Sequence, residues 1–285
     1  MAPDRSQSLG DRVERLAADP DPAPAEALAA VDELLDALEH GVVRAAERDV
    51  DGRWRAVGWV KRGILLGFRV GTLTDMSPEG GRGTFHFVDK STFPTRAMSL
   101  ADGVRIVPGG SAVRRGSYLA PGVVCMPPMY VNGGEWIGSG TTIDSHALVG
   151  SCAQIGARVH LSAAAQVGGV LEPVNASPVV IEDDVFVGGN CGVYEGTVVH
   201  SGAVLAAGVI LARGTPVYDV PRETVYRASA DAPLEIPSGA VVVPGARRHG
   251  GAFGEAHGLS LQSPVIVKYR DEGTDAATAL EHGLR

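Results

Sequence analysis

The chain of 285 residues is long enough for a large hydrophobic core and for two or three structural units. It carries 33 acidic residues against 25 lysines and arginines. This net charge of −8 argues against a nucleic-acid-binding protein, which would show a basic face. No apolar run approaches the ~18 residues that a membrane-spanning helix needs.

The chain begins with two predicted helices. Residues 1–24 are acidic and proline-rich and lack the apolar core of a secretion signal, so we expect a cytoplasmic protein. A short helix is expected over residues 9–18. Residues 25–40 predict an amphipathic helix that ends at Gly41. Its apolar stripe consists of Leu28, Val31, Leu34, Leu35 and Leu38.

Further short elements complete an α+β N-terminal domain, which we place at residues 1–103. Residues 42–57 predict a hairpin with its turn at Asp51–Gly52. Residues 59–68 predict a short buried helix, and residues 85–89 predict a strand. The basic residues of this helix region are expected to face solvent or a partner subunit: Lys61, Arg62 and Arg69.

From Val113 to Val217 an aliphatic residue returns every six positions. The phase holds from Val113 to Val167 and resumes at Ile181, and 16 of the 17 positions carry Val, Ile or Leu. This period is typical of a hexapeptide β-helix, in which three hexads make one triangular coil and the first residue of each hexad points inward. The 38 glycines suit its tight corners. An ordinary β-sandwich shows no fixed phase and is the weaker interpretation.

The fourth residue after each of these positions is usually small or β-branched. Examples are Ser117, Thr141, Ala147, Ala153, Thr197 and Ala203. The three cysteines, Cys125, Cys152 and Cys191, all fall inside the repeat. Their odd number predicts small buried apolar residues in a reducing compartment.

The repeat is interrupted between Val167 and Ile181, which are 14 residues apart, two more than two hexads need. A loop must leave the coil there, and loops that interrupt a rigid solenoid often line a site. Glu172 in this loop is therefore a candidate substrate-binding residue.

After Asp219 the hexads stop. Residues 223–228, 240–243 and 259–269 predict strands, and residues 275–284 predict a final helix. This small β-rich unit is expected to cap the open end of the stack, which otherwise leaves a bare sheet edge. We therefore predict a β-helix over residues 104–219 and a C-terminal domain over residues 220–285.

Acyl transfer to an amine needs a base for the ammonium proton, a donor for the oxyanion and a groove for the acyl carrier. Asp144 follows the inward Ile143 and should point outward, either as a base or as a solvated carboxylate. Arg105 lies where the chain enters the coil and is suited to bind a substrate carboxylate through two hydrogen bonds. The alternative for Arg105 is a surface ion pair.

Some late coils leave the backbone bare, so that a pantetheine arm can approach, although ordinary corners are the alternative. The residues concerned are Gly188, Gly189, Ala207 and Gly208. Three arginines are candidate contacts for the CoA phosphates: Arg213, Arg247 and Arg248. The alternative for each is a side chain that is simply solvated. Three histidines offer other bases or a zinc site shared between subunits: His146, His160 and His200. They hold the fourth, sixth and second places of their hexads. Because these places differ, a zinc site built from all three is disfavoured.

Several of these segments closely resemble tetrahydrodipicolinate N-succinyltransferase, a family of the lysine pathway. The most specific are Val149–Gly156, Val159–Ser162, Gly168–Pro173 and Val265–Lys268. The likeness begins at Arg44–Trp54 and Trp59–Arg69 and covers residues 25–268.

The resemblance implies a mainly β protein, a homotrimer of left-handed parallel β-helices with sites between subunits. It implies succinyl-CoA as co-substrate, an open-chain amino-oxopimelate as acceptor, and neither a permanently bound cofactor nor a metal. In family terms Arg105 falls on the residue that binds an acceptor carboxylate. Asp144 falls on the residue that contacts and deprotonates the acceptor amine.

The chain departs from the family where Gly-Ala-Arg-Ser-Glu is usual. Here the segment reads Gly188-Gly189-Asn190-Cys191-Gly192. Gly192 therefore stands where the family has its second catalytic carboxylate, a Glu. His146 replaces a family Trp, and Glu195 remains three residues beyond the missing Glu. These changes leave Asp144 as the one family-matched acid.

We predict a CoA-dependent N-acyltransferase, with the succinyl transfer of lysine and diaminopimelate synthesis as the leading reaction. The alternative is a paralogue that acylates a different amino-acid acceptor in a specialised pathway. A non-catalytic or zinc-binding hexapeptide protein is the less favoured alternative.

Overall fold

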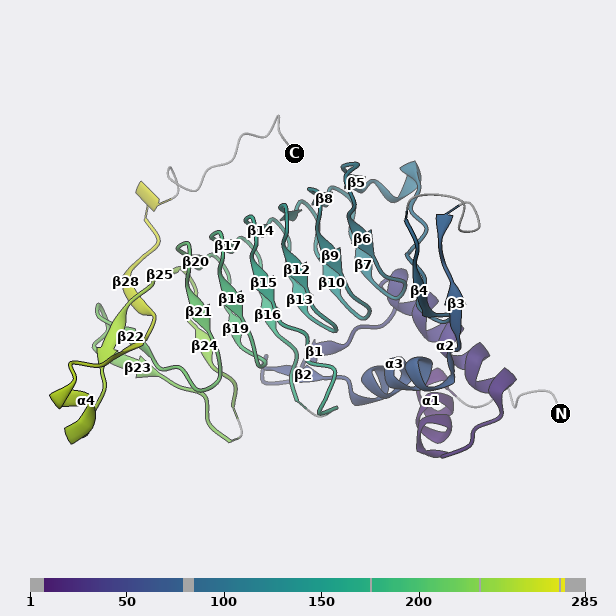
Figure 1. Cartoon of the computed structure of the whole chain (residues 1–285), viewed down its shortest axis with the longest axis horizontal. Coiled ribbons are helices and arrows are strands. Elements are labelled where there is room, and N and C mark those ends of the chain that lie inside the picture. Colours follow the sequence, from purple (N-terminus) through teal and green to yellow (C-terminus); the bar gives the residue numbers. More distant parts are fainter. Residues whose placement is uncertain (1–7, 79–84, 175, 231, 272, 275–285) are drawn as a thin grey trace.

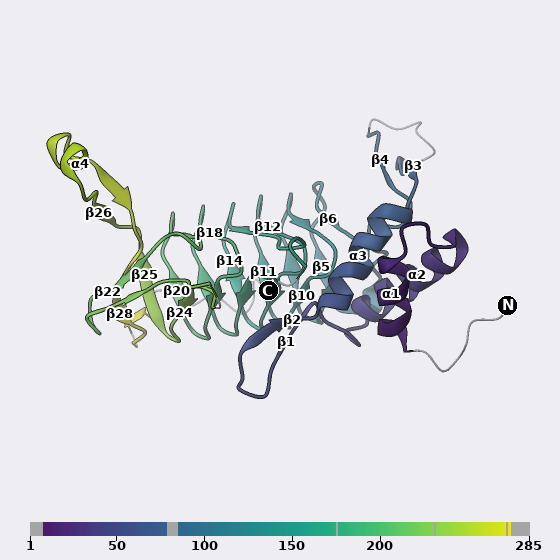
Figure 2. The same cartoon turned by 90° about the horizontal axis from the view of Figure 1, so that it is seen from below.

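The computed structural model describes residues 8–78, 85–174, 176–230, 232–271 and 273–274. It shows a mostly helical N-terminal domain, a long stack of parallel β-coils, and a C-terminal unit from which an arm projects (Figures 1 and 2). Within these ranges, no helix is long and apolar enough to cross a membrane.

The N-terminal domain packs three helices against one another and against the first coils. These are α1 (Leu9–Ala18), α2 (Pro24–Glu39) and α3 (Gly58–Val70). Gly41, in the left-handed conformation at φ 68°, follows the end of α2 as predicted. The expected hairpin is the antiparallel pair β1 (Ala46–Arg48) and β2 (Trp54–Ala56). A second antiparallel pair is formed by β3 (Leu73–Asp75) and β4 (Val88–Lys90), and a 3₁₀ turn, Leu100–Asp102, leads into the coils.

One expectation for α3 is wrong. Lys61 does not face solvent or a partner: its side chain is fully buried, and its Nζ donates to the carbonyl oxygen of Ala176 in the loop after Val167. Arg62 pairs with Glu14 of α1, and Arg69 donates to the carbonyl oxygen of Leu16. The cause is that α3 lies between α1, α2 and the coils, so its basic side chains bind the neighbouring elements.

The coils form a triangular prism with three parallel sheets, which we name after their first strands. The β5 sheet contains β5 (Arg105–Ile106), β8 (Val124–Cys125), β11 (Thr142–Ile143), β14 (His160–Leu161), β17 (Phe186–Val187), β20 (Val204–Leu205) and β25 (Ala240–Val243). The β6 sheet contains β6 (Ala112–Val113), β9 (Tyr130–Val131), β12 (Leu148–Val149), β15 (Gln166–Val167), β18 (Gly192–Val193) and β21 (Ile210–Leu211). The β7 sheet contains β7 (Tyr118–Leu119), β10 (Trp136–Ile137), β13 (Gln154–Ile155), β16 (Val180–Ile181), β19 (Val198–Val199) and β24 (Glu235–Ile236).

Three corners join the sheets. Corner 1 leads from the β5 sheet to the β6 sheet, corner 2 from the β6 sheet to the β7 sheet, and corner 3 from the β7 sheet back to the β5 sheet. The second residue of each strand points inward and pairs with its counterpart one coil away, as Ile143 does with Cys125 and Leu161. All 17 residues of the six-residue repeat are at most 5% exposed, which confirms the predicted β-helix.

The coil does not end with the hexad pattern at Asp219. Two later strands, β24 and β25, pair in parallel with β19 and β20 and add to the stack. The β5 sheet then closes with β28 (Val265–Tyr269), β22 (Val217–Asp219) and β23 (Thr224–Tyr226), as expected for a cap. The division of the chain after residues 103 and 219 stays a prediction, and the helix expected over residues 275–284 lies outside the described residues.

An arm leaves the prism directly after β25. It consists of β26 (Ala246–Arg248), α4 (Ala252–Ala256) and β27 (Ser260–Gln262), with β26 and β27 antiparallel (Figure 2). The three cysteines are free and buried, as predicted, and burial raises the pKa of the Cys125 thiol to about 12.

One carboxyl group is buried in the coil. Glu135 takes the place that the small residues Ser117 and Ala153 hold in the neighbouring coils, and it is 1% exposed. Burial raises the pKa of Glu135 well above its usual value, although a hydrogen bond from Ser117 and the charge of Arg114 oppose the shift. Glu135 is therefore uncharged in the folded protein over a range in which the unfolded chain ionises it.

We predict that Glu135→Gln stabilises the protein, and increasingly so as the pH rises. The unfolded carboxyl loses its proton near pH ~4.3, so the wild type loses up to about 1.4 kcal/mol of stability per pH unit between that value and the raised folded pKa. The amide does not titrate. Denaturant unfolding of both proteins at equal concentration, from pH 5 to pH 8, measures the difference. Parallel stability curves would contradict this account of Glu135.

Candidate functional site

Small residues and Asp144 form a column along corner 1. Asp144 and Ser145 begin it, and the corner residues of the next three coils follow: Ser162 and Ala163, Gly188 and Gly189, and Ala206 and Ala207. Backbone hydrogen bonds fix the alignment, including Ala164 N to Ser145 O at 2.9 Å and Gly208 N to Gly189 O at 2.9 Å. Strand spacing makes the column about 15 Å long. The structure thus places the predicted base and the predicted CoA-binding glycines and alanines along one edge of the prism.

Asp144 is half-buried at the start of this column. Its Oδ1 accepts a hydrogen bond of 2.7 Å from the backbone N–H of Ser145, which fixes the carboxylate at the corner. Arg105 is exposed on β5, in the same outward row as Thr142, two strands away. Two strand spacings put β5 and β11 about 10 Å apart, and Asp144 directly follows β11. One short substrate can therefore span from the Arg105 side chain to Asp144.

The arm continues from the far end of the column. A Cβ on Gly208 would lie 3.8 Å from the ring of Pro244, which is the first residue after β25. Arg247 follows on β26 and is half-buried. The predicted phosphate contact at Arg247 therefore lies on an arm that begins where the column ends. Gly188 also has a packing role, because a Cβ there would lie 2.5 Å from the backbone nitrogen of Ala207.

Two predicted site residues lie elsewhere. Glu172 is exposed in the loop that leaves corner 2, and Lys61 holds that loop to α3. Arg213 is also at corner 2, where its side chain donates to the carbonyl oxygens of Ser229 and Ala230. Glu195 accepts a hydrogen bond of 2.7 Å from the Arg213 backbone N–H. Within one chain, the β6 sheet separates these residues from Asp144.

The three histidines occupy different parts of the prism. His146 is exposed at corner 1 in the left-handed conformation, with φ 62°. His160 stacks on Phe186 on the β5 sheet, with ring centroids 5.0 Å apart. His200 is at corner 3 between Glu182 and Glu235, and its hydrogen bond with Glu182 raises its pKa. No cluster of three metal-binding side chains occurs in the part of the chain that the structure describes.

Comparisons with known proteins agree on one family. Residues 12–70 match the model of the tetrahydrodipicolinate N-succinyltransferase N-terminal domain, and residues 178–213 match the hexapeptide repeat of succinyl-transferase. A 2,3,4,5-tetrahydropyridine-2,6-dicarboxylate N-succinyltransferase of Polynucleobacter asymbioticus is 42% identical over 270 residues, which cover 93% of this chain and 92% of the relative. The chain belongs to the tetrahydrodipicolinate N-succinyltransferase family.

Other relatives support this membership. The enzyme of the same name from Bradyrhizobium diazoefficiens is 42% identical over 264 residues, covering 90% of this chain and 89% of the relative. A Campylobacter jejuni crystal structure, named as a 2,3,4,5-tetrahydropyridine-2-carboxylate N-succinyltransferase, superposes with a TM-score of 0.52 at 16% identity. That match covers 84% of this chain and 62% of the other and shows a shared fold.

Residues 190–192, which differ from the pattern expected for N-succinyltransferases, face three different ways. Asn190 is exposed at corner 1, and Cys191 lies inside the coil, 3.1 Å from the carbonyl oxygen of Ala206. Gly192 faces outward on the β6 sheet, beneath the ring of Tyr194. A Cβ on Gly192 would lie 2.4 Å from a Tyr194 ring carbon and 2.8 Å from the phenol oxygen. Tyr194 therefore fills the space that a larger residue 192 would need.

Sequence reasoning missed Tyr194 and also a cavity on the β7 sheet. Tyr194 lies two residues beyond the departure, and its ring folds back along the chain, which no spacing rule reveals. The cavity is lined by Tyr118 and Trp136, stacked at 4.1 Å on adjacent coils. Their separation of 18 residues, three hexads, was the available signal.

We predict that Gly192→Glu destabilises the protein and does not raise its activity. The new side chain must displace the Tyr194 ring, and overpacking of this kind costs about 1–3 kcal/mol. In a Tyr194→Ala background the same substitution should cost much less, so a double-mutant cycle of unfolding free energies should show a favourable coupling. Additive effects, or a large gain of activity with tetrahydrodipicolinate in the single variant, would contradict the steric account.

Proposed function

We propose that the chain transfers a succinyl group from succinyl-CoA to the amine of open-chain tetrahydrodipicolinate, in the cytoplasm, for lysine and diaminopimelate synthesis. The observation that supports this most strongly is the column along corner 1. A carboxylate stands at one end, about 15 Å of small side chains and bare backbone follow, and an arginine-bearing arm begins at the other end.

The column suits an extended acyl carrier. Its small side chains let pantetheine amides approach the backbone, and Arg247 on the arm is suited to meet CoA phosphates. The thioester carbonyl is then delivered to the coil that carries Asp144. Arg105, two strands away on the same face, binds an acceptor carboxylate and orients the amine.

The chemistry follows from these positions. Asp144 accepts a proton from the acceptor ammonium, and the neutral nitrogen attacks the thioester carbonyl carbon. The carbon–nitrogen bond forms, the carbon–sulfur bond breaks, and the CoA sulfur leaves as a thiolate that takes up a proton. A positioned base of this kind contributes about 10²–10⁴-fold to the rate.

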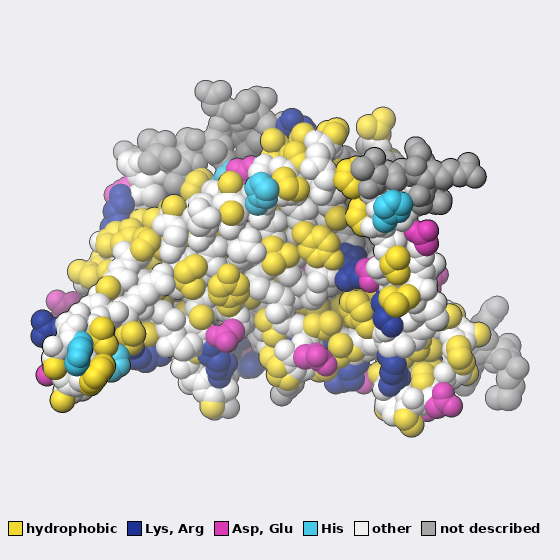
Figure 3. All heavy atoms as spheres, in the orientation of Figure 1, with side chains coloured by type: hydrophobic (Ala, Val, Ile, Leu, Met, Phe, Trp, Pro, Cys, Tyr) yellow, Lys and Arg dark blue, Asp and Glu magenta, His cyan; other side chains and the backbone are white. Residues whose placement is uncertain are grey.

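We also propose that the protein acts as a homotrimer. The outward rows of two sheets carry almost no charge. On the β6 sheet they are Ala112, Tyr130, Leu148, Gln166, Gly192 and Ile210. On the β5 sheet they are Arg105, Val124, Thr142, His160, Phe186, Val204 and Val241. Figure 3 shows a coil face with few charged side chains, whereas charged groups gather on the N-terminal domain and near the arm. Depletion of charge is typical of the core of an interface.

A trimer also explains why the predicted residues occupy two corners. A ring uses a heterologous interface, in which two different surfaces of the same chain meet. Corner 1 of one copy, with Asp144, then faces a different edge of its neighbour. Glu172 and Arg213 at corner 2 are suited to complete that site from the neighbouring copy.

The alternative, a paralogue that acylates another amino-acid acceptor, draws on one observation: Tyr194 stands over Gly192, where the family has a carboxylate. The relatives at about 42% identity favour the tetrahydrodipicolinate reaction. Assays with tetrahydrodipicolinate and with a panel of other amino-acid acceptors decide between the two.

We predict that Asp144→Asn lowers kcat at least about 10²-fold, because the amide cannot take the ammonium proton. The substitution is nearly isosteric, so assembly and CoA affinity should survive. Release of free thiol from succinyl-CoA gives the rate, and calorimetry with CoA gives the affinity. Full activity of the variant would remove Asp144 from the mechanism, and absence of CoA binding by the wild type would reject the proposed reaction.

We predict a solution mass of three times the 29.5 kDa of one chain. Tyr130→Asp places a charge in the uncharged row of the β6 sheet and should shift the protein toward monomer. Val50→Asp is the matched control, because Val50 is fully exposed in the β1–β2 turn and should leave the mass unchanged. Light scattering at micromolar concentration measures all three. A monomeric wild type would reject the trimer.

A further inference from the structure

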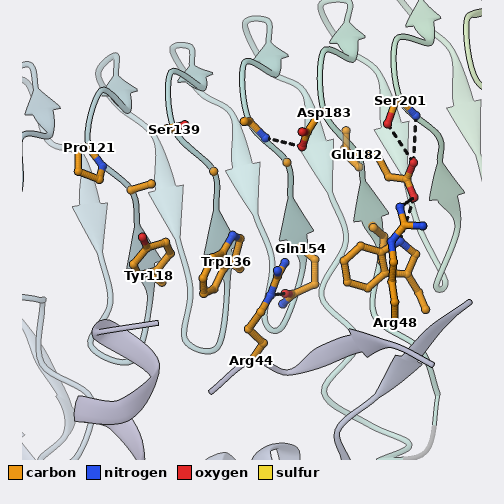
Figure 4. Close-up of a pocket in the computed structure, with 17 residues that line it drawn as sticks. Arg44, Arg48, Tyr118, Pro121, Trp136, Ser139, Gln154, Glu182, Asp183 and Ser201 are labelled. Atoms are coloured by element: carbon orange, nitrogen blue, oxygen red, sulfur yellow. Dashed lines mark hydrogen bonds and ion pairs between the residues drawn. The ribbon is translucent and has the colours of Figure 1, made fainter. Parts of the chain in front are cut away.

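A second site is built on the third face of the prism. A cavity of about 540 Å³ lies between the β1–β2 hairpin and the β7 sheet and reaches corner 3 (Figure 4). None of the described residues that line it belongs to the transferase site proposed at corners 1 and 2. The cavity therefore needs its own explanation.

Arg44 is held in this cavity by aromatic rings. Its guanidinium carbon lies 4.0 Å from the ring centre of Trp136 and 5.4 Å from that of Trp54. Its Nε donates to Oε1 of Gln154 at 3.0 Å. Gln154 is 1% exposed, and its amide nitrogen is bound to the carbonyl oxygens of Cys152 and Ala153, so Oε1 is fixed as an acceptor. The guanidinium plane is thus held in one orientation.

The terminal nitrogens of Arg44 remain available. Among the residues that the structure describes, neither Nη1 nor Nη2 makes a hydrogen bond or an ion pair. Burial lowers the pKa of Arg44 to about 10, which still leaves it protonated at neutral pH. A half-buried cation with no carboxylate in direct contact is costly for the folded protein, so this fork is suited to a bound anion.

The other cation of the cavity is already neutralised. Arg48 pairs with Glu182 at 2.6 Å, and the same carboxylate accepts hydrogen bonds from Trp54 Nε1 and from Ser201. His200 lies 3.2 Å from it. Despite partial burial, the His200 and Trp54 hydrogen bonds hold the pKa of Glu182 at about 2. Glu182 is therefore a fixed anion with four partners, and it neutralises the charge of Arg48.

A second carboxylate lines the cavity at corner 3. Asp183 is exposed, and its Oδ1 accepts a hydrogen bond of 2.9 Å from the backbone N–H of Ala157 (Figure 4). Its Oδ2 is 3.8 Å from Arg158, whose guanidinium is bound through two nitrogens to Asp184. Glu47 of β1 and Asp183 are both close enough for their charges to act on Arg44, and of the two Asp183 lines the cavity. The cavity therefore presents one unpaired cationic fork and one carboxylate with spare acceptor capacity.

We propose that this cavity binds a free α-amino acid in its zwitterionic form. The carboxylate of the ligand lies on the Nη1–Nη2 fork of Arg44, and its ammonium group lies toward Asp183. The ligand side chain lies against Tyr118 and the small corner residues Gly138 and Ala157. A dicarboxylate fits less well, because Asp183 repels its second charge, and a simple amine lacks the group that Arg44 needs.

The tryptophans make the site observable without any enzyme assay. The chain has three tryptophans, and Trp54 and Trp136 line the cavity, so Trp59→Phe leaves only reporters of the site. A panel of L-amino acids at millimolar concentration is titrated against this protein. The member that binds is then compared with two analogues, its amide and the same carbon skeleton without the amine. We expect saturable fluorescence change with the amino acid and at least about tenfold weaker binding of each analogue.

Variants locate the site. Arg44→Gln should weaken binding at least about tenfold, Arg44→Lys should weaken it less, and Asp183→Asn should also weaken it. Arg15→Gln, which removes an exposed arginine of α1 outside both proposed sites, is the matched control and should leave the affinity unchanged. Circular dichroism and light scattering verify that each variant is folded and assembled; if Arg44→Gln is not, Arg44→Lys and Asp183→Asn carry the test.

Three results would overturn the proposal: no saturable change with any amino acid, equal binding of the amide or the deaminated analogue, or unchanged affinity in folded variants of Arg44 and Asp183. The titration contains no CoA. A negative amino-acid titration therefore leaves the transferase proposal intact. Loss of succinyl transfer in Asp144→Asn likewise leaves the proposed amino-acid binding intact.

Discussion

The stacking of one inward aliphatic side chain per hexad is the interaction on which the rest of the structure depends. Each coil buries little by itself, so the core forms only when Ile143 lies directly between Cys125 and Leu161 and the same holds along all three sheets. This vertical register also aligns the corners. Residues that are 18 positions apart become neighbours in space, which is how Asp144 and Ser162 come to share one column at corner 1.

The N-terminal domain decides which faces of the prism remain open. Its β1–β2 hairpin covers part of the β7 sheet, where Arg44 and Arg48 bind Gln154 and Glu182. Lys61 of α3 holds the loop that interrupts the repeat. The β5 and β6 sheets keep nearly uncharged outward rows. One domain thus builds a cavity on one face, and the other two faces carry the rows that we propose for contact between copies.

The altered segment shows how a rigid coil limits change. Cys191 lies inside the coil, while Gly192 and the Tyr194 ring share the outer face of the β6 sheet. Because the backbone is fixed by the stack, a substitution can act only through the side chain at its own place in the hexad. The Tyr194 ring therefore decides what the outer face presents at residue 192.

The sequence by itself determined the β-helix, its inward residues and the loop after Val167, because a six-residue period is a local pattern that any coil must repeat. The family came from the resemblance of particular segments, such as Val149–Gly156. The sequence also offered Asp144 and several small residues as site candidates, and the structure aligns them along corner 1 while their roles stay predictions. Only the tertiary structure showed that Lys61 is buried, that Tyr194 covers Gly192, that β24 and β25 extend the coil beyond Asp219, and that Arg44 lies between two indoles. These features come from contacts between the repeat and parts of the chain that lack it, or between residues far apart in the sequence. No local pattern shows which side chains such contacts bring together.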